Sequence, residues 1–246
     1  MTSETKTIYM VVPCYNEEKR LNLEYWNELV KIVGTKWIFV NDGSSDNTLG
    51  LLQRIEKASV LSLDKNVGKA EAIRLGVLST YAELNQETFN FGYIDADGAF
   101  AIEDIKRIID ISNDSKKNFE GIWGARVKLA GRSIIRKDLR HILSRIIITF
   151  IGLRIRNLPY DIQTGFKTFK LNKEDMNMLN QKFKTRWFVD LEILLRFNQM
   201  NHKVLRVWEE PLNKWDDVSG SKIRGLQLFQ IFRDILIVIK LSRKWE

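Results

Sequence analysis

The sequence predicts an α/β protein in which a mostly parallel sheet carries helices on both faces. Short apolar runs alternate with helical patterns through the first half of the chain. The intervening helical patterns have the lengths, about 10–15 residues, that suit crossovers between parallel strands. Polar and acidic residues directly follow several of the apolar runs. That is the edge of a parallel sheet where ligands bind.

The predicted elements follow one another in a regular order. The expected strands are Thr7 to Val12, Trp37 to Val40, Val60 to Leu63 and Phe91 to Ile94. The expected helices between them are Leu21 to Val33, Asp46 to Lys57, Gly68 to Glu83 and Ile102 to Ser112. No internal repeat or Pro/Gly-rich linker interrupts the pattern. We therefore expect one large domain over residues 1–224 and a C-terminal helix over residues 225–246.

The composition fits a folded protein with anionic partners. The 246 residues are 44% hydrophobic and 28% charged, which supports a buried core and excludes wholesale disorder. The formal charge of +8 at pH 7 favours nucleotide phosphates, an acidic lipid surface or nucleic acid. One cysteine, Cys14, excludes an internal disulfide framework, and two histidines make a zinc cluster improbable. These counts predict an intracellular protein.

Neither a signal peptide nor a membrane-spanning helix is expected. The first residues lack a basic start followed by a long apolar core. The longest uncharged apolar stretch, Ile146 to Leu153, is eight residues long, whereas a spanning helix needs about 20.

The positive charge is concentrated in one segment. Residues 126–156 contain nine Lys or Arg and one acid, so this segment is +8 and the remainder of the chain is neutral. Within it, Ile134 to Leu153 predicts a helix with one apolar and one basic face, and Leu226 to Leu241 predicts a second. Such helices lie in membrane interfaces, where each Lys or Arg contributes about 1 kcal/mol. We therefore expect residues 132–156 and 225–246 to contact a membrane. In the alternative, the apolar faces belong to the core and the charges are solvated.

Two carboxylates, Asp95 and Asp97, directly follow the apolar run that ends at Ile94. Alternate residues leaving a strand point to the same side, so the pair would form a hard oxygen site suited to Mg²⁺ or Mn²⁺. The alternative is a turn in which Asp97 and Gly98 only end the strand.

Three further loops at strand ends carry candidate binding residues. Asp42 lies in the run IFVNDGSSDNT, where it could hold a base or ribose while the serines after it cap the next helix. Residues 15–17 are a polar helix start or part of a binding loop. Residues 66–70 form a Gly-containing helix entry where backbone amides and Lys69 could meet a phosphate. Their spacing matches neither the dinucleotide fingerprint nor the P-loop.

In this order, the motifs resemble those of the inverting family 2 glycosyltransferases of GT-A fold. The matching segments are VVPCYNEEKRL, FVNDGSSDNT, NVGKAEAIRLGV, YIDADGAF, WGARV, RSIIRKDLRHILSRI, DIQTGFKTFK, RWFVDLEIL and VWEEPLNKWDDVSGSK. They cover about residues 7 to 224 and are most similar to the dolichyl-phosphate glucosyltransferase branch, which is related to dolichyl-phosphate mannose synthases. The resemblance implies a Rossmann-like catalytic domain and metal-dependent, inverting transfer of a hexose. The expected donor is UDP-glucose and the expected acceptor a polyprenyl phosphate.

The resemblance and the charge pattern together suggest roles for individual residues. The nucleotide sugar would be bound by Pro13, Tyr15, Glu17, Asp42, Lys69, Asp95 and Asp97. The metal, Mg²⁺ or Mn²⁺, would be bound by Asp95 and Asp97, with Asp97 favoured as the direct ligand. The acceptor and its phosphate would be bound by Arg126, Arg132, Arg136, Gln163, Lys167, Ser221 and Lys222, with Gly165 and Phe166 lining the same side. The catalytic set would comprise Asp97, Arg126, Asp190 and Glu192.

Two departures from the family pattern stand out. Asn41 stands where many relatives carry a second Asp, which leaves Asp42 as the matched acid. The spanning anchor common in the eukaryotic branch is not found in this sequence. Attachment is therefore expected to be peripheral, on the cytoplasmic face of a membrane, with an integral-membrane partner as a further candidate.

The chemistry of the acceptor decides whether the reaction requires a base. The metal and Arg126 would neutralise the leaving diphosphate. A sugar hydroxyl must lose its proton, for which Asp190 or Glu192 would be the general base. A lipid monophosphate is already ionised and needs only cationic groups that hold it. The main alternative is therefore a family 2 enzyme acting on a sugar hydroxyl of a surface polysaccharide or a lipid-linked oligosaccharide.

Two other classes of protein fit less well. The run YIDADGAF also resembles the nucleophile motif of haloacid-dehalogenase-type phosphatases, but that fold places the motif on its first strand. A non-enzymatic module that binds nucleic acid through residues 126–156 would lack any recognised motif. Its acidic strand ends would also repel phosphates in the absence of a metal.

Overall fold

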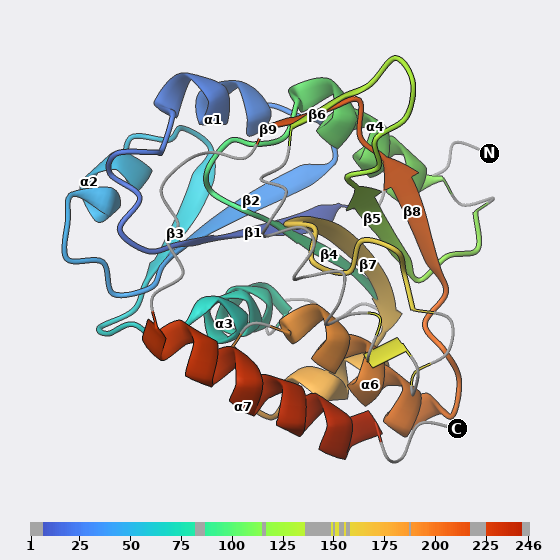
Figure 1. The fold of residues 1–246 in the computed structure, drawn as a ribbon. Helices are drawn as coiled ribbons and strands as arrows, with labels where there is room; N and C mark the ends of the chain where they lie inside the picture. The colour runs from blue at the N-terminus through green and yellow to red at the C-terminus, as the bar shows by residue number, and fades with distance from the viewer. Residues whose placement is uncertain are drawn as a thin grey trace.

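The computed structural model describes residues 7–81, 87–114, 117–135, 149, 151–152, 155, 158–186, 188–216 and 225–242, with the side chains of the last helix described from residue 230. A seven-stranded sheet of order β3-β2-β1-β4-β7-β5-β8 organises them (Figure 1). Its strands are β1 (Ile8–Cys14), β2 (Thr35–Asn41), β3 (Ala58–Ser62), β4 (Thr88–Ile94), β5 (Gly121–Ala125), β7 (Phe166–Asn172) and β8 (Val207–Pro211). Two short strands, β6 (Ser133–Ile135) and β9 (Lys214–Asp216), pair with each other. The helices are α1 (Leu23–Leu29), α2 (Thr48–Leu52), α3 (Lys69–Tyr81), α4 (Ile102–Asn113), α6 (Val189–Asn201) and α7 (Gly225–Ser242), with a 3-10 turn η1 (Asp175–Leu179).

The strands of the main sheet are parallel except β7, which runs antiparallel between β4 and β5. Strands β1, β2 and β4 are buried along most of their length, as expected of apolar runs covered on both faces. In the β4–β7 pair, Ile94 lies opposite Phe166. The turn before β7 therefore lies at the edge where the parallel strands end.

Helices cover both faces of this sheet, with α1, α2 and α4 on one and α3, α6 and α7 on the other (Figure 1). The first core includes Trp26 of α1 and Ile105 of α4. The second includes Ile73 of α3, Leu194 of α6 and Val238 of α7. This confirms the predicted fold class.

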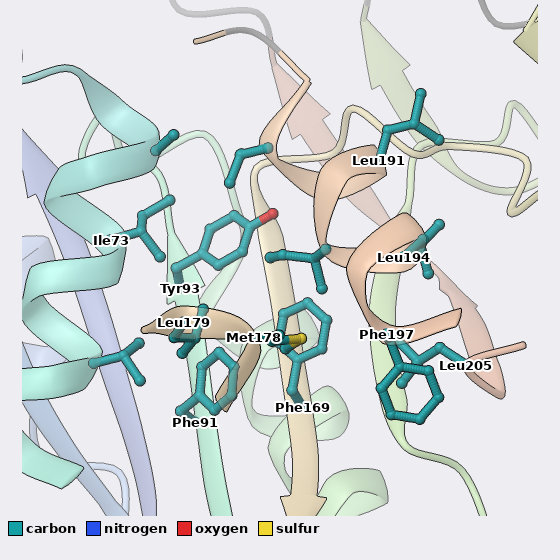
Figure 2. Close-up of a cluster of buried hydrophobic side chains, with 14 of the residues drawn as sticks. Ile73, Phe91, Tyr93, Phe169, Met178, Leu179, Leu191, Leu194, Phe197 and Leu205 are labelled. Carbon is teal, nitrogen blue, oxygen red and sulfur yellow. The ribbon is translucent and has the colours of Figure 1, made fainter. Parts of the chain in front are cut away.

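Aromatic side chains from adjacent strands form the centre of the second core (Figure 2). The ring of Phe169 on β7 stacks on Phe91 of β4 at 5.0 Å between ring centres and on Tyr93 at 6.3 Å. Burying a side chain of this size contributes about 2–3 kcal/mol. This packing fixes β4 against β7 and so fixes the relative position of the strand ends that carry polar residues.

Two predicted helices differ from the structure. The segment from Asp46 to Lys57 is helical only at Thr48–Leu52. The prediction of a helix from Ile134 is wrong at its start, because Ser133–Ile135 form β6 beside β9. A strand turns alternate residues to opposite sides, and Ile134 is buried while Ile135 is 61% exposed. Of the rest of that predicted helix, residues 149, 151 and 152 are helical, and Arg136 lies outside the described residues.

The predicted C-terminal helix is confirmed as α7, and it packs on α6. The side-chain amide of Gln199 donates to the carbonyl of Leu241 at 2.9 Å, and Val238 and Asp234 are buried. Phe232 and Leu236, in contrast, are 60% and 53% exposed. Within the described part of the chain, no helix is long and apolar enough to cross a bilayer. The proposed domain boundary at residue 224 stays a prediction.

Candidate active site

Asp95 and Asp97 directly follow β4, at the edge where the parallel strands end. The carboxylate of Asp95 pairs with the ammonium of Lys69, the first residue of α3. Asp97 accepts the backbone N–H of Ala99 at 3.2 Å. Burial and then the charge of Asp95 raise the pKa of Asp97. Among the described residues, the two carboxylates are not part of any cluster of three or more His, Cys, Asp or Glu that could hold a metal. Their hard oxygen atoms fit Mg²⁺ or Mn²⁺, because a divalent cation would neutralise both charges.

Gly165 allows the close approach of the turn before β7 to Asp95. The backbone N–H of Asp95 donates to the carbonyl of Gly165 at 3.0 Å. A Cβ atom on residue 165 would lie 2.1 Å from Oδ2 of Asp95, far inside any van der Waals contact. The antiparallel direction of β7 creates this contact, which the apolar pattern alone does not reveal.

Asp42, at the end of β2, organises the loop that leads into α3. Its carboxylate accepts the backbone N–H groups of Val67 at 2.7 Å and Gly68 at 2.9 Å, and the side-chain amide of Asn66 at 3.0 Å. Burial raises the pKa of Asp42, and the two backbone donors oppose that shift. Asp42 thus holds this loop in place, while its predicted contact with a nucleoside stays a prediction.

The loop after β1 is tied to the loop after β2 through Asn16. Its φ of 53° lies in the left-handed region, which asparagine tolerates better than most residues. Its backbone N–H donates to the hydroxyl of Ser44 at 3.1 Å, and its side-chain oxygen accepts the backbone N–H of Ser45 at 2.9 Å. The next backbone N–H, that of Glu17, donates to Thr48 at 2.7 Å. These hydrogen bonds therefore hold the two loops together.

Glu17, in the loop after β1, carries an unsatisfied hydrogen-bond acceptor. One carboxylate oxygen pairs with Arg20 at 2.5 Å, and the other is buried without a hydrogen-bond partner among the described residues. Burial raises the pKa of Glu17, and Arg20 opposes that shift. Beside it, Pro13 is half-buried and Tyr15 is 46% exposed. A buried orphan acceptor costs about 1–3 kcal/mol, so a donor group on a ligand would stabilise it.

Arg126 follows β5 and is held by Asp161. Two guanidinium nitrogens and the backbone N–H of Arg126 donate to this carboxylate, each at 2.8 Å. The guanidinium also lies 4.9 Å from the ring centre of Trp215 on β9. The backbone N–H groups of Tyr160 and Asp161 donate to Glu209 of β8 at 2.7 Å. Arg126 is therefore pre-oriented.

Sequence reasoning missed the three residues that orient Arg126. Asp161, Glu209 and Trp215 all lie in segments that carry the family resemblance. The signal in the sequence was that acidic and aromatic residues occur within those segments. The sequence does not show which strands pair, however, and so it does not show which cation these residues contact.

The other predicted acceptor residues are dispersed. Arg132 donates to the carbonyl of Pro211 at 2.5 Å, and Gln163 is half-buried in the turn before β7. Phe166 is buried in the core below that turn. Arg136, Ser221 and Lys222 lie outside the described residues.

Lys167 is fully buried, contrary to what a phosphate-binding side chain requires. Its ammonium donates to the carbonyl of Thr164 and lies 3.1 Å from Asp190. The rings of Tyr93 and Trp123 flank it, with centres at 5.5 and 4.8 Å. Burial lowers the pKa of Lys167 well below its usual value and raises that of Asp190 to about 7. From this position Lys167 supports Asp190 and does not reach an acceptor phosphate.

Glu192 also has a structural explanation. This buried carboxylate on the first turn of α6 accepts the backbone N–H groups of Lys184 and Thr185 at 2.8–3.0 Å and the hydroxyl of Thr185 at 2.9 Å. It also forms an ion pair with Arg196 at 2.7 Å. A carboxylate so fully engaged has no route to a substrate proton. Of the two predicted bases, only Asp190 is retained.

Arg186 is a further residue that sequence reasoning did not single out. Its backbone N–H donates to Asp234 of α7 at 2.6 Å. Its guanidinium reaches Asn66 at 3.4 Å and lies 3.3 Å from where a Cβ of Gly68 would be. Arg186 thus joins α7 to the loop that Asp42 holds.

Comparisons with known proteins identify the family. The family model for glycosyl transferase family 2 matches residues 9–178. The chain is 30% identical to a dolichyl-phosphate beta-glucosyltransferase of Trichomonas vaginalis, over 92% of this chain and 71% of that protein. It is 27% identical to the human protein of that name, over 96% of this chain and 76% of that one.

Solved structures show the same fold. Glucosyl-3-phosphoglycerate synthase of Mycobacterium tuberculosis, in complex with Mn²⁺, UDP and glucosyl-3-phosphoglycerate, matches with a TM-score of 0.64 at 15% identity, over 96% of this chain and 80% of that one. The same synthase with Mg²⁺ and UDP gives a TM-score of 0.61 at 14% identity, over 96% and 79%. The family and the GT-A fold expected from the motifs are both confirmed. The chain therefore belongs to glycosyltransferase family 2 and is a sugar-transferring enzyme of GT-A fold.

Proposed function

We propose that this enzyme transfers glucose from UDP-glucose to a dolichyl-like polyprenyl phosphate, with inversion and with a divalent cation. The observation that carries the proposal is the charge arrangement at one sheet edge. The carboxylates of Asp95 and Asp97 follow β4, and the pre-oriented guanidinium of Arg126 follows β5. A metal–diphosphate suits the first group and a monophosphate suits the second. The names of the relatives and the UDP and metal in the similar synthase support the same substrates.

The donor side would use the two tied loops and the acidic pair. Asp95 and Asp97 would hold Mg²⁺ or Mn²⁺, which would neutralise the diphosphate as it leaves. Diphosphate oxygens and water would complete the coordination. Glu17, whose second carboxylate oxygen has no hydrogen-bond partner among the described residues, would bind the nucleoside. The N-terminus of α3 favours a negative charge near Lys69.

The acceptor phosphate would need to be positioned but not deprotonated. A lipid phosphate arrives ionised, so Arg126 would hold it while Asp161 and Trp215 hold Arg126. Asp190, whose pKa is raised to about 7, carries only part of a negative charge at neutral pH. It therefore repels a phosphate less than an ordinary carboxylate would.

We further propose that the enzyme attaches peripherally to the cytoplasmic face of a membrane through α7. The exposed side of this helix presents Phe232 and Leu236 together with Arg233 and Lys240. Apolar side chains flanked by cations suit an anionic bilayer surface. Replacing Phe232 and Leu236 by Ser should abolish sedimentation with vesicles that contain phosphatidylserine. Met200→Ser, an exposed apolar change on α6, is the control. Unchanged sedimentation of the double variant would refute this contact.

A labelled transfer assay tests the main proposal. The enzyme is given labelled UDP-glucose, UDP-galactose, UDP-N-acetylglucosamine or GDP-mannose with a polyprenyl phosphate and Mg²⁺ or Mn²⁺. Label from UDP-glucose should enter the organic phase, Asp97→Asn should stop it, and Asp110→Asn, an exposed change on α4, should not. Transfer from another donor would correct the sugar. An unlabelled lipid with UDP still bound would refute the phosphate acceptor.

A further inference from the structure

Lys69 occupies the place beside Asp95 where the proposed function requires a metal. Its ammonium donates to Oδ1 of Asp95 and lies 5.9 Å from the ring centre of Tyr93. Desolvation would lower the pKa of Lys69, but the charges of Asp95, Asp190 and Asp97 together raise it. Among the described residues, the ion pair of this ammonium is with Asp95.

The two oxygens of Asp95 are not equivalent. Oδ2 faces the Cα of Gly165, where even a Cβ would be only 2.1 Å away. Oδ1 faces Lys69. A cation that approaches Oδ1 meets the ammonium first, and like charges at bonding distance from one oxygen repel each other.

Lys69 is also free enough to move. Its side chain is 42% exposed and extends from the first turn of α3, at the end of a long flexible stem. A bound diphosphate near the N-terminus of α3 would be the group that receives it.

We propose that Lys69 is a displaceable counter-ion for Asp95. In the nucleotide-free enzyme it holds the carboxylate in place and weakens the binding of free divalent cation. When the metal arrives with its nucleotide, Lys69 leaves Asp95 for the diphosphate. The inference rests on the proposed function, because it takes Asp95 to be a metal ligand. Its consequence is an enzyme that binds metal with the donor and not ahead of it.

Mn²⁺ binding, followed by the electron paramagnetic resonance signal of the free ion, tests the inference without an activity assay. Lys69→Met should bind Mn²⁺ about tenfold more tightly than the wild type without nucleotide, the scale of one removed neighbouring charge. With UDP present, that gain should disappear. Lys65→Met, an exposed change in the preceding loop, should match the wild type. Lys69→Arg should keep the weak binding, and Lys69→Gln replaces Lys69→Met if the latter does not fold.

The outcomes separate the inference from the proposed function. Unchanged or weaker Mn²⁺ binding in Lys69→Met and Lys69→Gln overturns the counter-ion role, and so does a gain that persists with UDP. Asp95→Asn should lose Mn²⁺ in every condition. If, with UDP present, the wild type and Asp95→Asn bind Mn²⁺ equally, or neither binds it, Asp95 is not the metal ligand. In that case the inference and the proposed metal site fail together.

Discussion

Replacing Gly165 by Ala should disable catalysis while leaving the fold intact. The new Cβ would lie 2.1 Å from Oδ2 of Asp95. Gly165 is not among the glycines with positive φ, so the backbone itself accepts alanine. The predicted effect is therefore a displacement of the carboxylate and not backbone strain.

The size of that effect follows from the displacement. Real Cβ atoms essentially never approach a heavy atom within 3.0 Å. Asp95 must therefore retreat by about 1 Å, and a misplacement of that size near the reacting atoms costs about 10²-fold in rate. This corresponds to about 2.7 kcal/mol of transition-state stabilisation.

The assay measures kcat and the dissociation constant of Mn²⁺ in the presence of UDP. Gly165→Ala should lower kcat about 10²-fold and weaken Mn²⁺ binding, with a thermal midpoint close to that of the wild type. Gly152→Ala is the control, because its nearest neighbour would be an ordinary 3.9 Å away. A Gly165→Ala enzyme within threefold of wild-type activity would refute the placement of Asp95 in the metal site.

Three other changes test separate parts of the structure. Burial raises the pKa of Asp190 to about 7, so the stability this group contributes is complete below about pH 4 and is lost as the pH rises through 7. Between pH 4 and pH 8, the free energy of unfolding of Asp190→Asn, measured with denaturant, should therefore rise relative to that of the wild type by about 1.4 kcal/mol per unit of pKa shift; an equal difference at the two pH values would contradict this. Glu192→Ala should lower the unfolding free energy by about 2–3 kcal/mol, because it leaves the backbone N–H groups of Lys184 and Thr185 without their acceptor and removes the ion pair with Arg196. A fully stable but inactive Glu192→Ala enzyme would restore Glu192 as a catalytic base. Gly43→Ala should weaken UDP binding in calorimetry about tenfold, since φ is +63° and a Cβ would lie 2.4 Å from the backbone of Lys65; unchanged UDP affinity would remove this loop from the donor site.

The donor half of the site could be predicted from the sequence. The spacing of the apolar runs indicates the strands, and the acids that directly follow those runs indicate where the strands end. Parallel strands end at one edge, so the acids after each apolar run were expected to meet there. The structure does place Asp42, Asp95 and the loop of Glu17 along that edge. In contrast, an apolar run does not indicate whether its strand pairs in parallel or antiparallel. The antiparallel β7 and the contact of Gly165 with Asp95 were therefore not foreseen.

The burial of charged side chains was the second feature that the sequence did not reveal, after the direction of β7. A lysine in DIQTGFK suggests a phosphate ligand, because lysines are almost never fully buried. Lys167 is the exception, since Tyr93 and Trp123 lie opposite it on both neighbouring strands. Glu192 lies on α6, a helix in which nine of thirteen residues are buried. Charged and amide residues interrupt the apolar ones along this helix, so the sequence did not reveal that Glu192 is buried. β6 depends on β9, a partner about 80 residues away, which no local pattern reveals.

A paired acceptor assay tests the central claim most directly. Labelled UDP-glucose is offered with a polyprenyl phosphate or with the corresponding polyprenol, which presents a hydroxyl on the same chain. The account predicts label on the phosphate alone, and an Asp190→Asn enzyme that retains at least about a tenth of the wild-type rate, since loss of a general base costs 10²-fold or more. Label on the polyprenol, or a loss of 10²-fold or more in Asp190→Asn, would show that the enzyme deprotonates its acceptor and would contradict the account.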